Sequence, residues 1–260
     1  MSNCIRIILL WTVFQLSSSA YSQESNEELA KASQNPIANM ISFPFQNNTN
    51  FGIGSYNRTQ NILNIQPVLP FFNGRLITRT IMPVISQPDI SSESGSTFGL
   101  GDITFTAFFA PESKGGPIWG IGPAINIPTS GESLGTGEWG FGPSLVFLLM
   151  KSKWVVGGIL NNVWSIDDNN SLNLLFFQCL INYNFKDGLY LSSAPIITSN
   201  WNAESGDEWT IPLGAGIGKI VKLGGKLPLN LQVGAYYNVV RPESGADWQL
   251  RALAVLLFPN

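Results

Sequence analysis

The chain has 260 residues, of which only 12% are charged, against about a quarter in an average soluble protein. So few charges cannot coat a soluble surface, and no run reaches the ~18 apolar residues that a membrane-spanning helix requires. The chain also contains no histidine, which outer-membrane lipases, proteases and acyltransferases commonly use as a general base. If the membrane surrounds this protein, strands must span it.

The first 22 residues have the features of a secretory signal peptide. Arg6 precedes an apolar stretch over residues 7–16, and small residues follow, with cleavage expected near Ala20 or Ser22. Export of this kind removes the stretch, which is too short to act as an anchor.

The next segment, residues 23–39, is polar. It contains good helix formers between Glu27 and Lys31. We expect it to form a mobile or weakly helical periplasmic extension. The remainder, residues 40–260, has no obvious linker and is predicted to be one domain.

Within this domain, apolar residues recur at every second position, which is typical of strands with one apolar face. The last segment is the clearest, with one face formed by Trp248, Leu250, Ala252, Ala254, Leu256 and Phe258, and the other by Gln249 and Arg251. The pattern predicts twelve strands at 41–51, 59–71, 75–86, 98–109, 117–127, 138–149, 154–163, 172–185, 189–201, 208–220, 229–240 and 247–258. The seventh and eighth are apolar on both faces, so ten or fourteen strands also fit.

The turns between these segments separate by charge. Alternate turns hold seven of the eight lysines, namely Lys114, Lys151, Lys153, Lys186, Lys219, Lys222 and Lys226. The other turns hold most of the acidic residues, including Asp89, Glu93, Glu132, Asp167, Asp168, Glu204, Asp207, Glu243 and Asp247. An even number of strands places alternate turns on opposite sides of a membrane, with the longer loops outside. Chance sorting of charges that avoid lipid is the alternative.

These observations predict an all-β protein, a transmembrane antiparallel up-and-down β-barrel of about 12 strands with short periplasmic turns and longer extracellular loops. A soluble β-sandwich is the competing fold, in which the same aromatic side chains would form the core. The poverty of charge favours the barrel.

Charges inside the strands are the candidate functional residues. A charge facing lipid near the midplane costs roughly 2 to 4 kcal/mol, so Arg79, Asp102 and Arg251 are expected to point inward. With Gln66, Gln232 and Tyr236 they are predicted to line the lumen or its constriction. Arg79 and Asp102 lie on neighbouring strands, where an ion pair would either fill a narrow interior or form a charged constriction. No catalytic residue, metal site or cofactor is expected.

Several motifs resemble those of a known family. They are Gln34–Asn39, Pro44–Asn50, Thr59–Asn61 to Pro67, Thr78–Thr80 to Pro88, Gly99–Asp102, Trp154–Gly157, Asn161–Ser165, Ala235–Val240 and Asp247–Arg251. Nearly the whole mature chain is similar to a family of bacterial outer-membrane barrels described as transporters of the meta-pathway of phenol degradation. Some relatives carry the name neuromedin U, a mistaken label on a bacterial protein. The resemblance implies the outer membrane of a Gram-negative bacterium and supplies no site residues.

We therefore expect a channel or transporter through which small solutes, apolar or aromatic ones included, diffuse passively. A closed structural or adhesive barrel that presents acidic surface loops is the alternative, and a membrane-embedded enzyme is the weakest reading. The expected partners are outer-membrane lipid, lipopolysaccharide, an unknown small solute, and the barrel-assembly machinery through the C-terminal strand ending at Phe258; no nucleic acid is expected.

Overall fold

The computed structural model describes residues 25–113, 115–131, 133–167 and 171–259. The predicted signal peptide, residues 1–22, lies outside the described residues. In the described part of the chain, no helix is long and apolar enough to cross a membrane.

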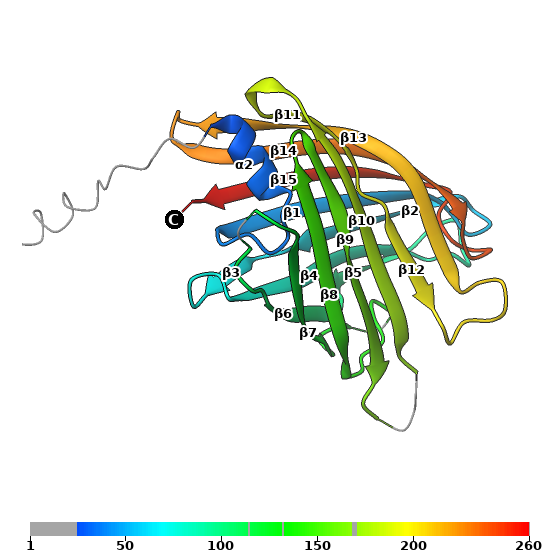
Figure 1. Ribbon diagram of the computed structural model, residues 1–260. Helices are drawn as coiled ribbons and strands as arrows, with labels where there is room; N and C mark the ends of the chain where they lie inside the picture. Colours follow the sequence, from blue (N-terminus) through cyan, green and yellow to red (C-terminus); the bar gives the residue numbers. More distant parts are fainter. Residues whose placement is uncertain (1–24, 114, 132, 168–170, 260) are drawn as a thin grey trace, which may run out of the picture.

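Fifteen strands form one antiparallel sheet (Figure 1). They are β1 (Ile41–Ile53), β2 (Arg58–Ile65), β3 (Val68–Phe71), β4 (Leu76–Pro88), β5 (Ser96–Leu100), β6 (Ile103–Phe109), β7 (Ile118–Ile127), β8 (Gly140–Lys151), β9 (Trp154–Ser165), β10 (Asn173–Asn184), β11 (Leu189–Ser193), β12 (Ile196–Asn200), β13 (Trp209–Leu223), β14 (Leu227–Val240) and β15 (Trp248–Phe258). A helix, α2 (Asn26–Ser33), precedes them, and a short 3-10 helix, η1 (Lys186–Gly188), follows β10.

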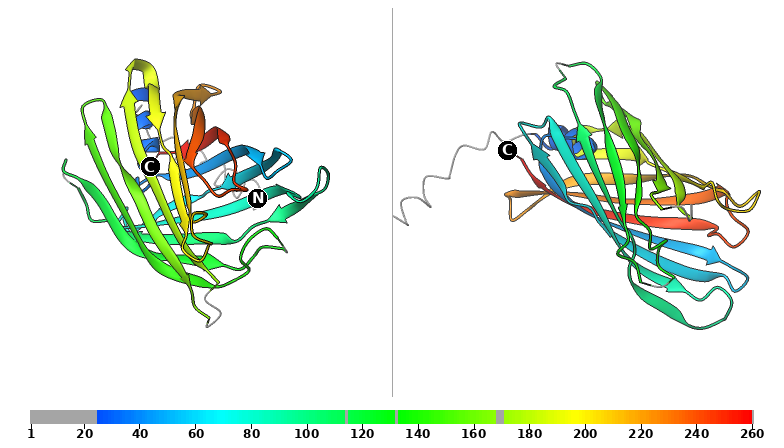
Figure 2. Two further views of the ribbon diagram at one scale, coloured as in Figure 1. Left: turned by 90° about the vertical axis from the view of Figure 1, so that its right-hand side faces the viewer. Right: turned by 90° about the horizontal axis from the view of Figure 1, so that it is seen from below.

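The sheet closes on itself as a barrel of twelve wall segments, because β1 pairs with β15 as well as with β2. Three segments are each interrupted once: β2 continues as β3, β5 as β6, and β11 as β12. The predicted fold class and the count of twelve are confirmed, and Figure 2 shows the strands wrapping round into one wall.

The barrel has two ends, which we name by what they carry. The terminal end holds α2, the end of β15 and the short turns, including residues 152–153 and 224–226 (Figure 1). The loop end holds the connections over 89–95, 128–139, 201–208 and 241–247. The predicted separation of charge follows this division, since Lys151, Lys153 and Lys222 belong to the terminal end, and Asp89, Glu204 and Glu243 to the loop end.

Side chains alternate between the outer face and the interior along each strand. In β8, Phe141, Leu145 and Phe147 are exposed, whereas Ser144 and Val146 between them are buried. Exposed aromatic side chains mark both ends of the outer face: Trp154 and Phe258 at the terminal end, and Trp139, Trp164, Trp201 and Trp248 at the loop end. Such aromatic girdles are typical of barrels that cross a lipid bilayer.

One polar cluster interrupts the apolar outer face. Asn47 and Thr49 of β1 alternate with the inward-facing Gln46 and Asn48, so they face outward next to Asn61 of β2. The Asn47 and Asn61 amides donate to each other at 2.8 and 3.0 Å, and Asn61 also donates to the Thr49 hydroxyl at 3.0 Å. Because these polar groups bind one another, they tolerate an apolar environment.

The interior of the terminal half is mainly apolar. Inward-facing Val155 and Ile159 of β9 and Leu180 of β10 are buried in clusters with side chains from other strands. This packing explains why the segments over 154–163 and 172–185 are apolar on both faces, since one face contacts lipid and the other fills the barrel.

The segment predicted as an extension forms a capped helix packed inside the terminal end. Ser25 and Glu28 make a reciprocal capping box, in which the Glu28 N–H donates to the Ser25 hydroxyl at 3.2 Å and the Ser25 N–H to the Glu28 carboxylate at 2.9 Å. Leu29 and Ala30 are buried against Met40, Tyr190, Ile220, Val255 and Leu257. The pattern of one buried pair among polar residues therefore marks a docked helix, not a free tail.

Candidate functional site

The loop half of the lumen is an open vestibule of two lobes with volumes of about 450 and 570 Å³. Six residues line both lobes, which makes them the place where the lobes meet: Arg79, Ile81, Thr104, Phe176, Thr198 and Thr210. The junction of the two lobes is thus formed by β4, β6, β10, β12 and β13.

Two of the three strand interruptions place polar groups at the floor of this vestibule. Pro67 and Pro195 lack an N–H and cannot continue a hydrogen-bond ladder. Gln66, just before Pro67, turns its side chain inward, and Ala194, just before Pro195, leaves its carbonyl free to bind a side chain.

Arg251 of β15 uses that carbonyl. Its Nη1 donates to Ala194 O at 2.6 Å, its Nε to Asn48 Oδ1 at 3.1 Å and its Nη2 to Gln249 Oε1 at 2.9 Å. Its guanidinium carbon lies 4.5 Å from the centre of the Tyr236 ring. Arg251 is 3% exposed, and each of its nitrogens has a neutral partner, so the charge is held in place without a carboxylate.

From Arg251 a chain of amides runs along the wall across β15, β1, β2 and β4. Gln249 Nε2 donates to Asn50 Oδ1 at 2.8 Å, and Asn50 Nδ2 donates to Gln60 Oε1 at 2.7 Å. Gln60 in turn donates to Gln87. Because every link is a side-chain hydrogen bond between neighbouring strands, the chain fixes a polar surface on one side of the vestibule.

Arg79 is placed differently. Within the described chain its guanidinium has one hydrogen-bond partner, Gln66, whose Oε1 accepts from Nη2 at 2.6 Å. It lines both lobes and the narrower cavity beneath them. A guanidinium offers five N–H donors, so most of those on Arg79 remain available to a molecule in the vestibule.

The prediction of an ion pair between Arg79 and Asp102 is wrong, because the described residues form no such pair. Asp102 lies at the third strand interruption, between β5 and β6, and its carboxylate accepts from the backbone N–H groups of Ser130, Thr136 and Gly137 at 3.1, 2.7 and 3.0 Å. It thereby holds the connection over 128–139 and lines neither lobe of the vestibule. The one salt bridge among the described residues joins Arg241 to Asp247 at 2.6 Å, within the connection over 241–247.

The other predicted residues lie inside the barrel below or beside the vestibule. Gln232 accepts from the Tyr190 hydroxyl at 3.2 Å and lines a cavity of about 120 Å³ with Arg79 and Arg251. Tyr236 is 2% exposed and packs on Arg251. The structure therefore groups Arg251 with Tyr236, and Arg79 with Gln66, while Asp102 stands apart.

The small cavity is closed on its other side by the segment after α2, over residues 33–36. Gln34 and Asn184 exchange amide hydrogen bonds at 2.8 and 3.2 Å, and Asn230 donates to the Ser33 hydroxyl at 3.1 Å. A reciprocal amide pair of this kind fixes the segment to the inner wall. Residues 33–36 therefore line this cavity from its terminal side and are held against the wall.

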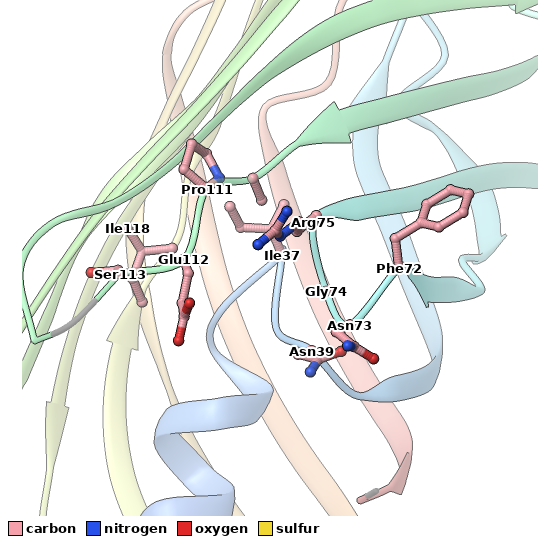
Figure 3. Close-up of a pocket in the computed structure, with 11 residues that line it drawn as sticks. Ile37, Asn39, Phe72, Asn73, Gly74, Arg75, Pro111, Glu112, Ser113 and Ile118 are labelled. Carbon is pink, nitrogen blue, oxygen red and sulfur yellow. The ribbon is translucent and has the colours of Figure 1, made fainter.

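A separate cavity of about 830 Å³ opens at the terminal end beside this segment. Figure 3 shows Ile37, Arg75 and Phe72 around it, with Glu112 and Ser113 on the facing connection. It shares no lining residue with the vestibule. A cluster that contains Ile37, Ile77, Phe108 and Ile159 packs between the two.

Sequence reasoning missed several residues of this lumen, namely Gln46, Asn48, Ala194, Phe176 and the amide chain. Residues 46–50 are polar on both faces, so the pattern gives no reason to place Gln46 and Asn48 inward. Pro67 and Pro195 lie at two of the interruptions, but Pro44, Pro83 and Pro123 lie within continuous strands, so proline alone does not locate an interruption.

The closed wall, the aromatic girdles and the apolar outer face define a membrane-spanning β-barrel. The chain belongs to the family described as "Putative MetA-pathway of phenol degradation", whose sequence profile matches residues 42–240. No curated protein matches the chain in sequence.

Among the solved structures that share the fold are a channel and a porin. The COG4313 outer membrane channel from Pseudomonas putida F1 is 18% identical, with a TM-score of 0.58, and the match covers 84% of this chain and 94% of that one. The NanC porin is 7% identical, with a TM-score of 0.54, and the match covers 85% of this chain and 100% of that one.

Proposed function

We propose that the protein is a channel of the outer membrane of a Gram-negative bacterium, through which small solutes diffuse. In this proposal the loop end faces the outside and the terminal end faces the periplasm. The observation that carries it is the vestibule, which leads from the loop end to Arg79 and Arg251 in the middle of the barrel. The fold shared with an outer membrane channel and a porin supports it.

A mixed lining suits small organic solutes better than bulk ions. Ile81 and Phe176 offer apolar contact, whereas Thr104, Thr198 and Thr210 offer hydroxyl groups. Binding must be favourable enough for a solute to enter and weak enough for it to leave, and scattered hydroxyl and apolar contacts meet that condition.

Passage to the terminal end requires the segment over 33–36 to move. The contacts that hold it are neutral hydrogen bonds and one small apolar cluster. Neutral hydrogen bonds contribute only about 0.5–1.5 kcal/mol each, and uncovering the buried Leu29 adds about 1.5–3 kcal/mol, so displacement of the segment costs several kcal/mol. We infer that α2 and residues 34–36 act as the gate of the channel.

Conductance of the purified protein tests the proposal. In planar bilayers we expect discrete conductance steps, because a gate that moves as a unit gives two levels. Arg79→Ala should change their size, since Arg79 lines the small cavity between the vestibule and the segment over 33–36. Complete silence from protein that shows the heat-dependent gel mobility of a folded barrel would remove the proposal.

The closed structural barrel is the second candidate, and the packing of α2 inside the terminal half is the observation that favours it. In that case the helix never leaves, and the acidic connections at the loop end carry the function. Deletion of the connection over 201–208 would then abolish a surface phenotype while permeability to small solutes stays unchanged.

A further inference from the structure

We propose that the floor of the vestibule binds small organic monocarboxylates, with the carboxylate on the Arg79 guanidinium and the apolar body against Ile81 and Phe176. This inference rests on the proposed channel function and names the class of solute for the same lumen.

Arg79 has no counter-charge among the described residues. Arg251 donates hydrogen bonds from Nε, Nη1 and Nη2 to three protein acceptors, and its guanidinium stacks on Tyr236. Arg79 has Gln66 alone, and the one salt bridge of the described chain lies elsewhere, at the loop end. A cation taken out of bulk water is costly unless it is paired, so the free donors of Arg79 favour an anionic ligand.

The geometry of the Arg79 guanidinium suits a carboxylate. The donors of a guanidinium form a planar fork that binds a carboxylate through two parallel hydrogen bonds. Gln66 takes one Nη2 donor, which leaves a second edge of the fork available. A carboxylate fits such an edge better than a monatomic anion, which receives the same charge without the paired hydrogen bonds.

Part of the vestibule wall is apolar. Ile81 and Phe176 line both lobes together with Arg79, and Ile159 and Phe108 extend the apolar surface in the smaller lobe. An inorganic anion would leave this surface in contact with water, whereas the body of an organic acid would cover it. The lobes, of 450 and 570 Å³, lie within the range of ordinary ligand pockets.

Acidic residues in the smaller lobe limit the charge that a ligand can carry. Asp207 and Glu208 line the smaller lobe toward the loop end, where they accept from the backbone N–H groups of Glu243 and Gly206, both at 2.8 Å. A second carboxylate on the ligand would meet these acids. One negative charge at the Arg79 end and a neutral body therefore match the vestibule best.

Equilibrium binding to the full chain in detergent tests this site. Benzoate is the probe, benzyl alcohol its neutral counterpart, benzylamine its cationic counterpart, and acetate the carboxylate without an apolar body. We expect benzoate to bind at least about tenfold more tightly than each of the other three, a factor of ten being worth about 1.4 kcal/mol. Isothermal titration calorimetry measures all four.

Variants assign the effect to residues. Arg79→Gln should abolish the preference for benzoate over benzyl alcohol, and Arg79→Lys should keep part of it, because lysine retains the charge and loses the fork. Phe176→Ala should weaken benzoate binding and leave acetate binding unchanged. Arg75→Gln is the matched control, since this arginine lines the separate cavity at the terminal end and neither lobe of the vestibule, and it should leave all four affinities unchanged.

Equal affinity for benzoate and benzyl alcohol, or unchanged benzoate binding in folded Arg79→Gln, would overturn the inference. If inorganic phosphate bound as tightly as benzoate, the apolar wall would contribute nothing to binding, and the proposed preference for organic acids would be wrong. Because binding in detergent does not require conductance, the outcomes separate: steps in bilayers without benzoate preference contradict this inference alone, and benzoate binding without conductance contradicts the channel alone.

Discussion

The two halves of the lumen share one wall and differ in what faces inward. Toward the loop end, the inward side chains of β1 and β2 are amides that hydrogen-bond to one another and leave an open vestibule. Toward the terminal end, the inward side chains are mainly apolar and pack against α2 and Ile37. Lipid imposes the same outer face on both halves, so the inward residues alone decide which half is open.

The comparison also explains why the helix is needed. Polar inward side chains remain in contact with water at no cost, whereas apolar ones such as Ile220 and Leu257 lower the free energy only when they are covered. Leu29 and Ala30 supply that cover. The closure of the terminal half is therefore a packing event that a change in the first part of the chain can reverse.

The largest effect is expected from removal of the segment that covers the terminal half. A refolded chain that begins at Ile37 lacks α2 and the Gln34–Asn184 pair, and we expect its single-channel conductance to be several-fold higher than that of a chain that begins at Ser25. Gel mobility before and after heating verifies that both are folded. Equal conductance would mean that the wall side chains close the lumen unaided.

A smaller effect follows from loosening the helix without removing it. Leu29 is 2% exposed, and Leu→Ala in a packed interior costs about 2–5 kcal/mol. In Leu29→Ala we expect more frequent openings with the full-length step size, recorded in planar bilayers. Glu27→Ala, at an exposed position on the same helix, serves as the control and should open no more often than the wild type.

The packing of the cluster around Tyr190 can also be tested by a substitution in the barrel wall that overpacks it. A Cβ on Gly218 of β13 would lie 2.2 Å from the Tyr190 ring, so Gly218→Ala should lower the free energy of unfolding by about 1–3 kcal/mol. Gly131 has no atom within 4 Å of such a Cβ, and Gly131→Ala should change it little. Denaturant unfolding in detergent compares the two, and equal losses would contradict the tight packing of Tyr190.

The outer face was predictable and the lumen was only partly so. Period-two alternation gave the twelve wall segments and the inward direction of Arg79 and Arg251, because a lipid-facing charge is so costly. The Arg79–Asp102 pair failed because the interruption after β5 turns Asp102 toward the connection over 128–139. That contact joins residues 28 and more positions apart, which periodicity does not report.

The docked helix escaped prediction for a similar reason. Gln34 and Asn184 are 150 positions apart, and neither residue type alone indicates a partner. The capping box Ser25–Glu28 was a local signal of a helix start, but it says nothing about where the helix packs.

The smallest effect concerns pH and the start of α2. Hydrogen bonds from the Ser25 backbone N–H and hydroxyl lower the pKa of Glu28 below its ordinary value of 4.5. A lowered pKa means that this carboxylate stabilises the capped helix fully above pH 4.5, and that the contribution is lost as the pH falls through the lowered value. We therefore expect more frequent channel openings as the solution at the terminal end is acidified below pH 4.5.

Asp89 at the loop end also has a lowered pKa, through hydrogen bonds from the Ser91 hydroxyl and backbone N–H, so a pH response alone does not assign the effect. Glu28→Gln removes one titrating group and should flatten the response, whereas Asp89→Asn should leave it intact. If both variants respond like the wild type, the gate does not depend on the capping box. If only Asp89→Asn is flat, the acid-sensitive element belongs to the open half and not to the closed one.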